Sequence, residues 1–152
     1  MARHQRPDGT IFVVCTPCRI RYSDIDGMKF VHHSKINDHF EDPRLVAMRK
    51  LMKLSYGKLE DKYNISQSIR FAYYDYFKAL RFEDRCKVMS YLIVKESNRH
   101  YMTFYQEIFR GDSLLVKLTM RIAFFDRSST NPVSLPEKIQ ENVRKTILAL
   151  SS

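Results

Sequence analysis

The chain has 152 residues, 44% of them hydrophobic and 12% aromatic, and its 26 Lys and Arg against 17 Asp and Glu give a formal charge of +9. The apolar content excludes intrinsic disorder, and the low content of Gly and Pro excludes long flexible linkers. Folding at this length buries about 70% of the unfolded surface, so we expect one domain, or a small unit that pairs with itself. The positive charge favours an anionic partner: nucleic acid, an acidic membrane surface, a phosphorylated cofactor or an acidic protein.

The cysteines and the N-terminus indicate the cellular setting. Three cysteines, at positions 15, 18 and 86, are an odd and sparse set, as expected in a reducing cytoplasm. Cys15 and Cys18 have the CxxC spacing of a redox pair or half a zinc site, but no second ligand pair follows, so we interpret them as ordinary thiols and expect no metal. No apolar stretch approaches the ~20 residues of a membrane helix, and residues 1–9 lack the apolar core of a secretory signal. We therefore expect a cytoplasmic protein without a membrane span.

The first expected element is a strand at 11–22. Its β-branched and apolar residues give way to alternating arginines, which is the period of a half-buried strand. Pro17 inside this strand indicates an edge or a bend, because proline donates no hydrogen bond to a neighbour. Residues 23–27 are a cluster typical of a turn.

A long helix is expected next, with Ser34 as its N-cap. Apolar residues recur at helical spacing as far as Leu54, Arg44 falls on the opposite, polar face, and Gly57 is the expected stop. Pro43 leaves two alternatives, a kinked helix or two short helices, because an interior proline clashes with the preceding turn.

The second half of the chain contains four runs rich in Tyr, Phe, Val and Ile, separated by short turns. The expected strands are 66–78, 85–96, 100–109 and 113–126. Such short connections join antiparallel neighbours, because a parallel crossover needs a dozen residues or more. A polar loop at 128–136 leads into a final helix. The order predicts an α+β fold with a five-stranded antiparallel sheet, one domain at 11–150 after a polar tail at 1–10, and a second copy of the chain covering the remaining apolar surface.

The most informative segment for chemistry is the passage from the first strand into the long helix. It places Asp26 in a short loop just before the helix begins. The first backbone N–H groups of a helix are unpaired and carry a partial positive charge, so they can polarise a carbonyl whose oxygen becomes anionic during attack. A carboxylate beside them can act as nucleophile or as general base on water. This arrangement suits the hydrolysis of an activated acyl group.

The same residues resemble a known family. The pattern Y-x-D-x-D-G-x-x-x-V-H-H-S at 22–34, followed by F-E-x-x-R at 40–44, is similar to the signature of hotdog-fold acyl-CoA thioesterases of the 4-hydroxybenzoyl-CoA thioesterase type. The resemblance continues in Y-F-K-A-L-R-F-E-D at 76–84 and covers residues 11–145. It implies a hotdog fold, in which the sheet wraps around the central helix, and assembly into homodimers or homotetramers. It also implies that the protein hydrolyses the thioesters of acyl-CoA or acyl carrier protein to acid and thiol, without a further cofactor.

The resemblance also implies roles for individual residues. Asp26 falls on the catalytic aspartate of the family, and His33 on the position whose backbone N–H faces the thioester oxygen. His32 and Ser34 become candidate substrate contacts. Arg81 and Arg85 become candidate contacts to a nucleotide phosphate or a carrier protein, together with the wider basic surface. The sequence departs from the family pattern at Lys29, Ile36 and Pro43, where a small residue, an aromatic residue and alanine are usual.

Several alternatives remain open from the sequence. Asp24 and Asp26 are also typical turn residues. Glu41 and Arg44 have the spacing of a helical ion pair, although a related subgroup places a catalytic acid on this helix. The aromatic run at 71–77 suits a sheet core and interface better than an acyl pocket.

Two other functions compete with hydrolysis. A hydratase or dehydratase on acyl thioesters uses the same fold, but the spacing from Asp26 to His32 and His33 is longer than in those enzymes. A basic module without activity, binding nucleic acid or an acidic protein, lacks a recognition motif here, so we expect no nucleic-acid partner. The sequence leaves four points undetermined: the identity of the acyl group, whether coenzyme A or a carrier protein holds it, whether the assembly is a dimer or a tetramer, and whether Asp26 acts as nucleophile or as general base.

Overall fold

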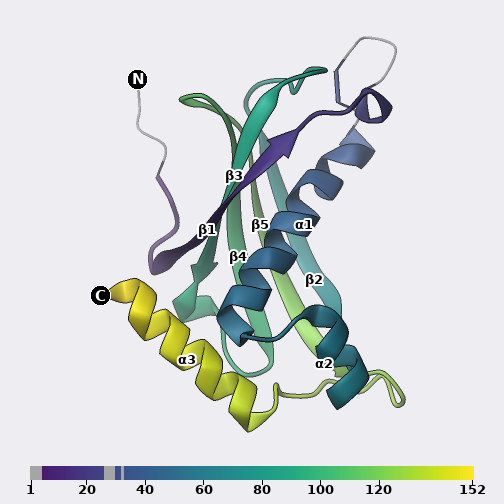
Figure 1. Ribbon diagram of the computed structural model, residues 1–152, viewed down its shortest axis with the longest axis vertical. Helices are drawn as coiled ribbons and strands as arrows, with labels where there is room; N and C mark the ends of the chain where they lie inside the picture. The colour runs from purple at the N-terminus through teal and green to yellow at the C-terminus, as the bar shows by residue number, and fades with distance from the viewer. Residues whose placement is uncertain (1–4, 26–29, 32) are drawn as a thin grey trace.

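The fold is an antiparallel sheet curved around one long helix (Figure 1). The computed structural model describes residues 5–25, 30–31 and 33–152. The strands are β1 (Thr10–Arg19), β2 (Ile65–Tyr76), β3 (Arg85–Ile93), β4 (Tyr101–Arg110) and β5 (Ser113–Asp126). The helices are α1 (His33–Met52), α2 (Tyr56–Tyr63) and α3 (Glu137–Ser151), with the 3₁₀ turns η1 (Tyr22–Asp24) and η2 (Val94–Glu96). The prediction of an α+β fold with a five-stranded antiparallel sheet and a C-terminal helix is confirmed.

The strand order is β1-β3-β4-β5-β2, and every pair of neighbours is antiparallel. The short connections after β3 and β4 join strands that lie side by side, as expected. The same expectation is wrong for β2 and β3, because β2 pairs with β5 whereas β3 lies between β1 and β4. The eight residues between β2 and β3 can extend over ~26 Å, enough to pass the ends of two strands. Strands β1 and β2 form the two edges of the sheet, so Pro17 lies on an edge strand as expected.

The main core lies between the sheet and α1, which crosses its concave face (Figure 1). Phe40, Met48 and Leu51 on α1 are fully buried against strand residues that alternate inward, such as Val88 and Phe104. This alternation places every second strand residue on the face toward α1. A smaller cluster on the opposite face contains Tyr91, Ile93 and Tyr105.

Two predicted boundaries of the helical region are wrong. Helix α1 begins at His33, so Ser34 belongs to its first turn and is not its N-cap. The helix ends at Met52, where Lys53 adopts a left-handed φ of 55°. Gly57 therefore does not stop this helix and lies inside α2, whose N-cap Ser55 accepts a hydrogen bond from the N–H of Lys58.

Helix α1 continues through Pro43, which decides between the two sequence alternatives in favour of one helix. The assignment of Arg44 to the solvent face is also wrong, because this side chain is only 3% exposed. Its guanidinium donates to Oε1 of Gln106 on β4 at 3.3 Å, whereas Glu41 is exposed. Burial lowers the pKa of Arg44, which shows that the charged group lies in an unfavourable environment.

The remaining strand limits differ from the predictions by a few residues. Strand β3 stops at Ile93 because η2 follows, and β1 stops at Arg19 ahead of η1. In the N-terminal tail, Arg6 lies over the outer face of the sheet, where its Nε donates to the buried carboxylate of Glu107 at 3.1 Å. Among the described residues, no helix has the length and apolar character needed to cross a membrane.

Candidate functional site

The start of α1 is the centre of the candidate site. This helix has 20 residues, and no acidic residue occupies its first turn. The first four N–H groups of a helix have no partner within it, and the aligned peptide dipoles make this end positive. The helix thus presents a group of donors, beginning at His33, that can stabilise an oxyanion.

The chain enters this helix along a path fixed by the turn before β3. The N–H of Val31 donates to the carbonyl of Leu80 at 2.9 Å, and Phe30 forms a β-bridge with Arg81. The turn itself is held by Asp84, whose Oδ2 accepts the N–H of Arg81 at 2.7 Å. The same oxygen lies 2.8 Å from the guanidinium of Arg110. These contacts set where the helix start lies relative to the sheet.

A buried polar chain lies at η1, the 3₁₀ turn that follows β1. The carboxylate of Asp24 is 3% exposed and accepts the N–H of Arg21 at 2.8 Å. Its Oδ2 is also 3.0 Å from Nε2 of His39, although the N–H does not point directly at the oxygen. On the other side of the ring, Nδ1 of His39 lies 3.3 Å from Sγ of Cys18. With the thiol donating to Nδ1, Nε2 carries the proton that faces Asp24.

This chain of three groups joins β1, η1 and α1. Desolvation, with smaller contributions from Cys86 and Asp24, raises the pKa of Cys18 to about 12, so it remains a neutral thiol at physiological pH. Asp24 is a turn residue, as one interpretation of the sequence expected, and its carboxylate also connects this turn to α1. It precedes Asp26 by two positions in the sequence. Sequence reasoning missed His39. The signal was present, because His39 follows Ile36 by three positions on the apolar stripe of the helix.

The sequence-predicted site residues fall into three groups. Asp26 and His32 lie outside the described residues. His33 and Ser34 form the start of α1, and their side chains likewise lie outside the description. Arg81 is exposed next to the path into α1, with its guanidinium 5.9 Å from the ring centre of Phe30.

Arg85 is placed differently from Arg81. It begins β3 and pairs across the sheet with Arg19, while its neighbour Cys86 is buried on the inner face. Because successive strand residues point to opposite faces, Arg85 belongs to the face away from α1. The structure therefore brings Arg81, but not Arg85, to the start of the helix.

The CxxC pair does not form one site. Cys15 lies opposite Met89 and is exposed, whereas Cys18 lies opposite Cys86 on the inner face. Their odd separation along a strand puts the two thiols on opposite faces. All three cysteines are free, and in the described part of the chain no cluster of three or more His, Cys, Asp or Glu side chains could hold a metal ion.

Comparison with known proteins agrees with this fold. The family model of the thioesterase-like superfamily matches residues 20–143. The acyl-CoA thioesterase YbgC of Haemophilus influenzae is 26% identical over 124 residues, which cover 82% of this chain and 89% of the relative.

Solved structures with the same fold include two naphthoyl-CoA thioesterases. The DHNA-CoA thioesterase of Staphylococcus aureus superposes with a TM-score of 0.79 at 21% identity, covering 90% of this chain and 91% of the other. The 1,4-dihydroxy-2-naphthoyl-CoA thioesterase of Synechocystis gives a TM-score of 0.73 at 17% identity, covering 90% and 96%.

The family match spans most of the chain, from the end of β1 into α3. The chain belongs to the thioesterase-like superfamily, and the family resemblance inferred from its motifs is confirmed.

Proposed function

We propose that this protein hydrolyses the thioester bond of acyl-CoA, or of acyl carrier protein, at the start of α1. The observation that carries the proposal is the helix start itself, in a chain of the thioesterase-like superfamily. The first N–H groups of this helix begin seven residues after Asp26 in the sequence. A related protein is named as an acyl-CoA thioesterase, which supports the same reaction here.

In this proposal the backbone N–H of His33 polarises the thioester carbonyl and stabilises the oxyanion that forms during attack. Asp26 attacks the carbonyl directly or removes a proton from the attacking water, and the thiol leaves. His32 and Ser34 contact the acyl or pantetheine portion of the substrate. The reaction requires no further cofactor.

The positive surface suits the phosphates of coenzyme A or an acidic carrier protein. Arg81 is the best placed of the predicted contacts, because it is exposed beside the path into α1. Arg85 belongs to the opposite face of the sheet and would reach the substrate only across an assembly. The free cysteines are consistent with a cytoplasmic location.

We further propose that the working unit contains two copies joined through β2. This strand is an edge, and within the described residues no strand pairs with its outer side. Its exposed side chains are unusually apolar for an edge: Ile69, Phe71, Tyr73 and Tyr76, followed by Phe77. Exposed apolar edge strands associate with another strand, and a symmetric pair of β2 strands would extend the sheet across both copies.

Sedimentation velocity tests the assembly. We expect a dimer or a pair of dimers for the wild type and a shift to monomer for Ile69→Lys combined with Tyr73→Lys, because charges on an edge oppose pairing. Leu148→Lys on α3, which is equally exposed, serves as the control and should leave the mass unchanged. A monomeric wild-type protein would contradict the proposed assembly.

Hydrolysis of a panel of acyl-CoAs, followed with a reagent for free thiols, tests the activity. Asp26→Asn, which is nearly isosteric, should lower kcat by at least ~100-fold, the range expected for loss of a general base or nucleophile. Asp38→Asn, an exposed acid in α1, is the matched control and should retain activity. Equal rates for the wild type and Asp26→Asn would remove Asp26 as the catalytic group. Hydration of enoyl-CoA without hydrolysis would favour the hydratase alternative.

A further inference from the structure

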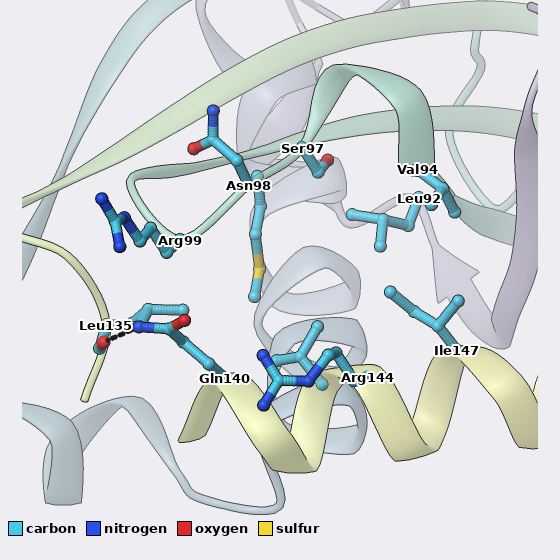
Figure 2. Close-up of a pocket in the computed structure, with 11 residues that line it drawn as sticks. Leu92, Val94, Ser97, Asn98, Arg99, Leu135, Gln140, Arg144 and Ile147 are labelled. Carbon is cyan, nitrogen blue, oxygen red and sulfur yellow. Dashed lines mark hydrogen bonds between the residues drawn. The ribbon is translucent and has the colours of Figure 1, made fainter. Parts of the chain in front are cut away.

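A cavity lies under α3, remote from the start of α1. It has a volume of about 210 Å³, is partly open to solvent, and is lined by the end of β3, the η2 segment, the start of β4 and one face of α3 (Figure 2). Strand β3 runs from the turn beside the candidate active site to this cavity. Its nine residues span about 30 Å, so the two places are at opposite ends of the sheet.

The cavity is polar at one end and apolar at the other. Leu92, Val94 and Ile147 lie at one end in Figure 2, and the side chains of Arg99 and Gln140 lie at the other. The guanidinium of Arg144 is directed from α3 toward that polar end. Among the lining residues there are two guanidinium groups and no carboxylate.

The existing partner of Arg144 is weak. Its Nη2 is 3.8 Å from Oε1 of Glu137, and the two side chains are 60% and 85% exposed. Solvent-exposed ion pairs of this kind contribute little, so a ligand anion at the cavity mouth can replace Glu137 at small cost.

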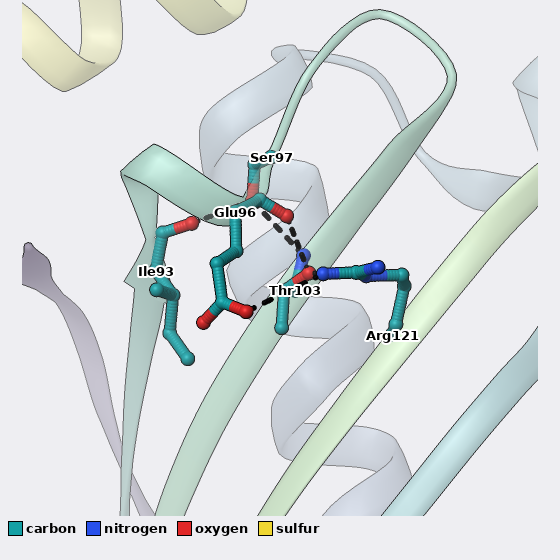
Figure 3. Close-up of polar contacts among 5 residues, drawn as sticks. All are labelled: Ile93, Glu96, Ser97, Thr103 and Arg121. Carbon is teal, nitrogen blue, oxygen red and sulfur yellow. Dashed lines mark hydrogen bonds and ion pairs between the residues drawn. The ribbon is translucent and has the colours of Figure 1, made fainter. Parts of the chain in front are cut away.

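The wall opposite α3 is held in place by partly buried hydrogen bonds (Figure 3). Oγ of Ser97 donates to the carbonyl of Ile93 at 2.8 Å and accepts the N–H of Thr103 at 3.0 Å. The hydroxyl of Thr103 donates to the carbonyl of Glu96 and accepts from Nε of Arg121 at 3.0 Å. These hydrogen bonds fix the η2 segment to β4, and a wall already ordered in this way lowers the entropic cost of binding a ligand.

We propose that this cavity binds a medium-chain fatty acid as its carboxylate, with the alkyl chain toward Leu92 and Ile147 and the head between Arg99 and Arg144. The charge of the mouth selects an anion, and the apolar floor selects a chain. An apolar cavity of about 150 Å³ holds benzene, so this one accommodates a chain of about eight carbons. Guanidinium groups pair well with carboxylates in forked geometry.

Isothermal titration calorimetry with octanoate, butanoate and octanol tests the proposal. Each methylene buried from water contributes a factor of about four in affinity, so butanoate should bind up to about 200-fold more weakly than octanoate. Octanol should also bind more weakly, because it lacks the charge. The titrations are carried out on Asp26→Asn as well as on the wild type, and a change in affinity would place the ligand in the catalytic site.

Variants at the mouth complete the test. Arg99→Gln combined with Arg144→Gln should weaken octanoate at least ~10-fold while leaving octanol unchanged, since one or two charge-assisted hydrogen bonds are lost. Val143→Phe, which fills the cavity, should abolish binding of both. Lys145→Gln, an exposed change on the same helix, is the control. The absence of octanoate binding, or binding that neither the arginine pair nor Val143→Phe alters, would overturn the proposal.

Discussion

Removal of His39 is the sharpest test of the buried polar chain that joins η1 to α1. His39→Phe keeps a ring of similar size against the core but leaves the carboxylate of Asp24 without its neighbour at 3.0 Å. The two side chains are 7% and 3% exposed, so water does not replace the lost contact. Leaving a buried polar group without its partner costs about 1–3 kcal/mol, and more for a charged group, so we expect a loss of about 3 kcal/mol in the free energy of unfolding.

Urea denaturation at pH 7 measures this loss. With a slope of about 2 kcal/mol per molar, typical of a domain of this size, the midpoint should fall by about 1.5 M. Asp24→Asn retains an oxygen for the N–H of Arg21, so in combination with His39→Phe it removes the unpaired charge and should recover at least about 1 kcal/mol. His100→Phe, at an exposed histidine, is the control and should not move the midpoint.

The additivity of the two losses in stability tests whether Asp24 and His39 interact. If the losses for His39→Phe and Asp24→Asn add to within about 0.5 kcal/mol in the double variant, the two side chains do not interact and the reasoning is refuted.

Three further predictions address the buried polar groups. Gln106→Leu should destabilise the protein by about 2 kcal/mol, because the guanidinium of Arg44 loses its acceptor. The cost should be smaller when Arg44 is also replaced by Met, and chemical denaturation of the wild type, the two single variants and the double variant checks this. Burial raises the pKa of Cys18 to about 12 from an ordinary value of 9.0. The unfolded chain therefore loses its thiol proton at a lower pH than the folded chain, and the free energy of unfolding should fall as the pH rises from about 9 to 12. Cys18→Ala should make that fall shallower in midpoints measured against pH, and an unchanged slope would contradict it. Thr103→Val should cost about 1–3 kcal/mol, because Thr103 is fully buried and its hydroxyl has two partners; a change below 0.5 kcal/mol would count against the rigid wall of the α3 cavity.

The strands and the two hairpins from β3 to β5 could be predicted because local signals and short connections agree there, whereas the pairing of β2 with β5 could not. Alternating apolar residues and short turns determine antiparallel neighbours without knowledge of the final packing. The motif around Asp26 and His33 is likewise a local pattern, so its residues and its place before a helix are visible in the sequence.

The errors arose where tertiary contacts override local propensity. Ser55 and the left-handed Lys53 divide what reads as one amphipathic segment into α1 and α2, which a glycine stop signal at Gly57 does not reveal. Arg44 looks like a surface residue by its chemistry, but the helix direction and the acceptor on Gln106 bring it inside.

The sequence by itself determined the class of the fold, the order of its elements along the chain and the segment in which catalysis is proposed, because each depends on residues close together in the chain. Only the tertiary structure decided which distant residues meet. It joined Cys18, Asp24 and His39 from three elements, separated Arg81 from Arg85 across the sheet, and formed a cavity between η2 and α3. Such contacts depend on the register and crossing of whole elements, which no local pattern encodes.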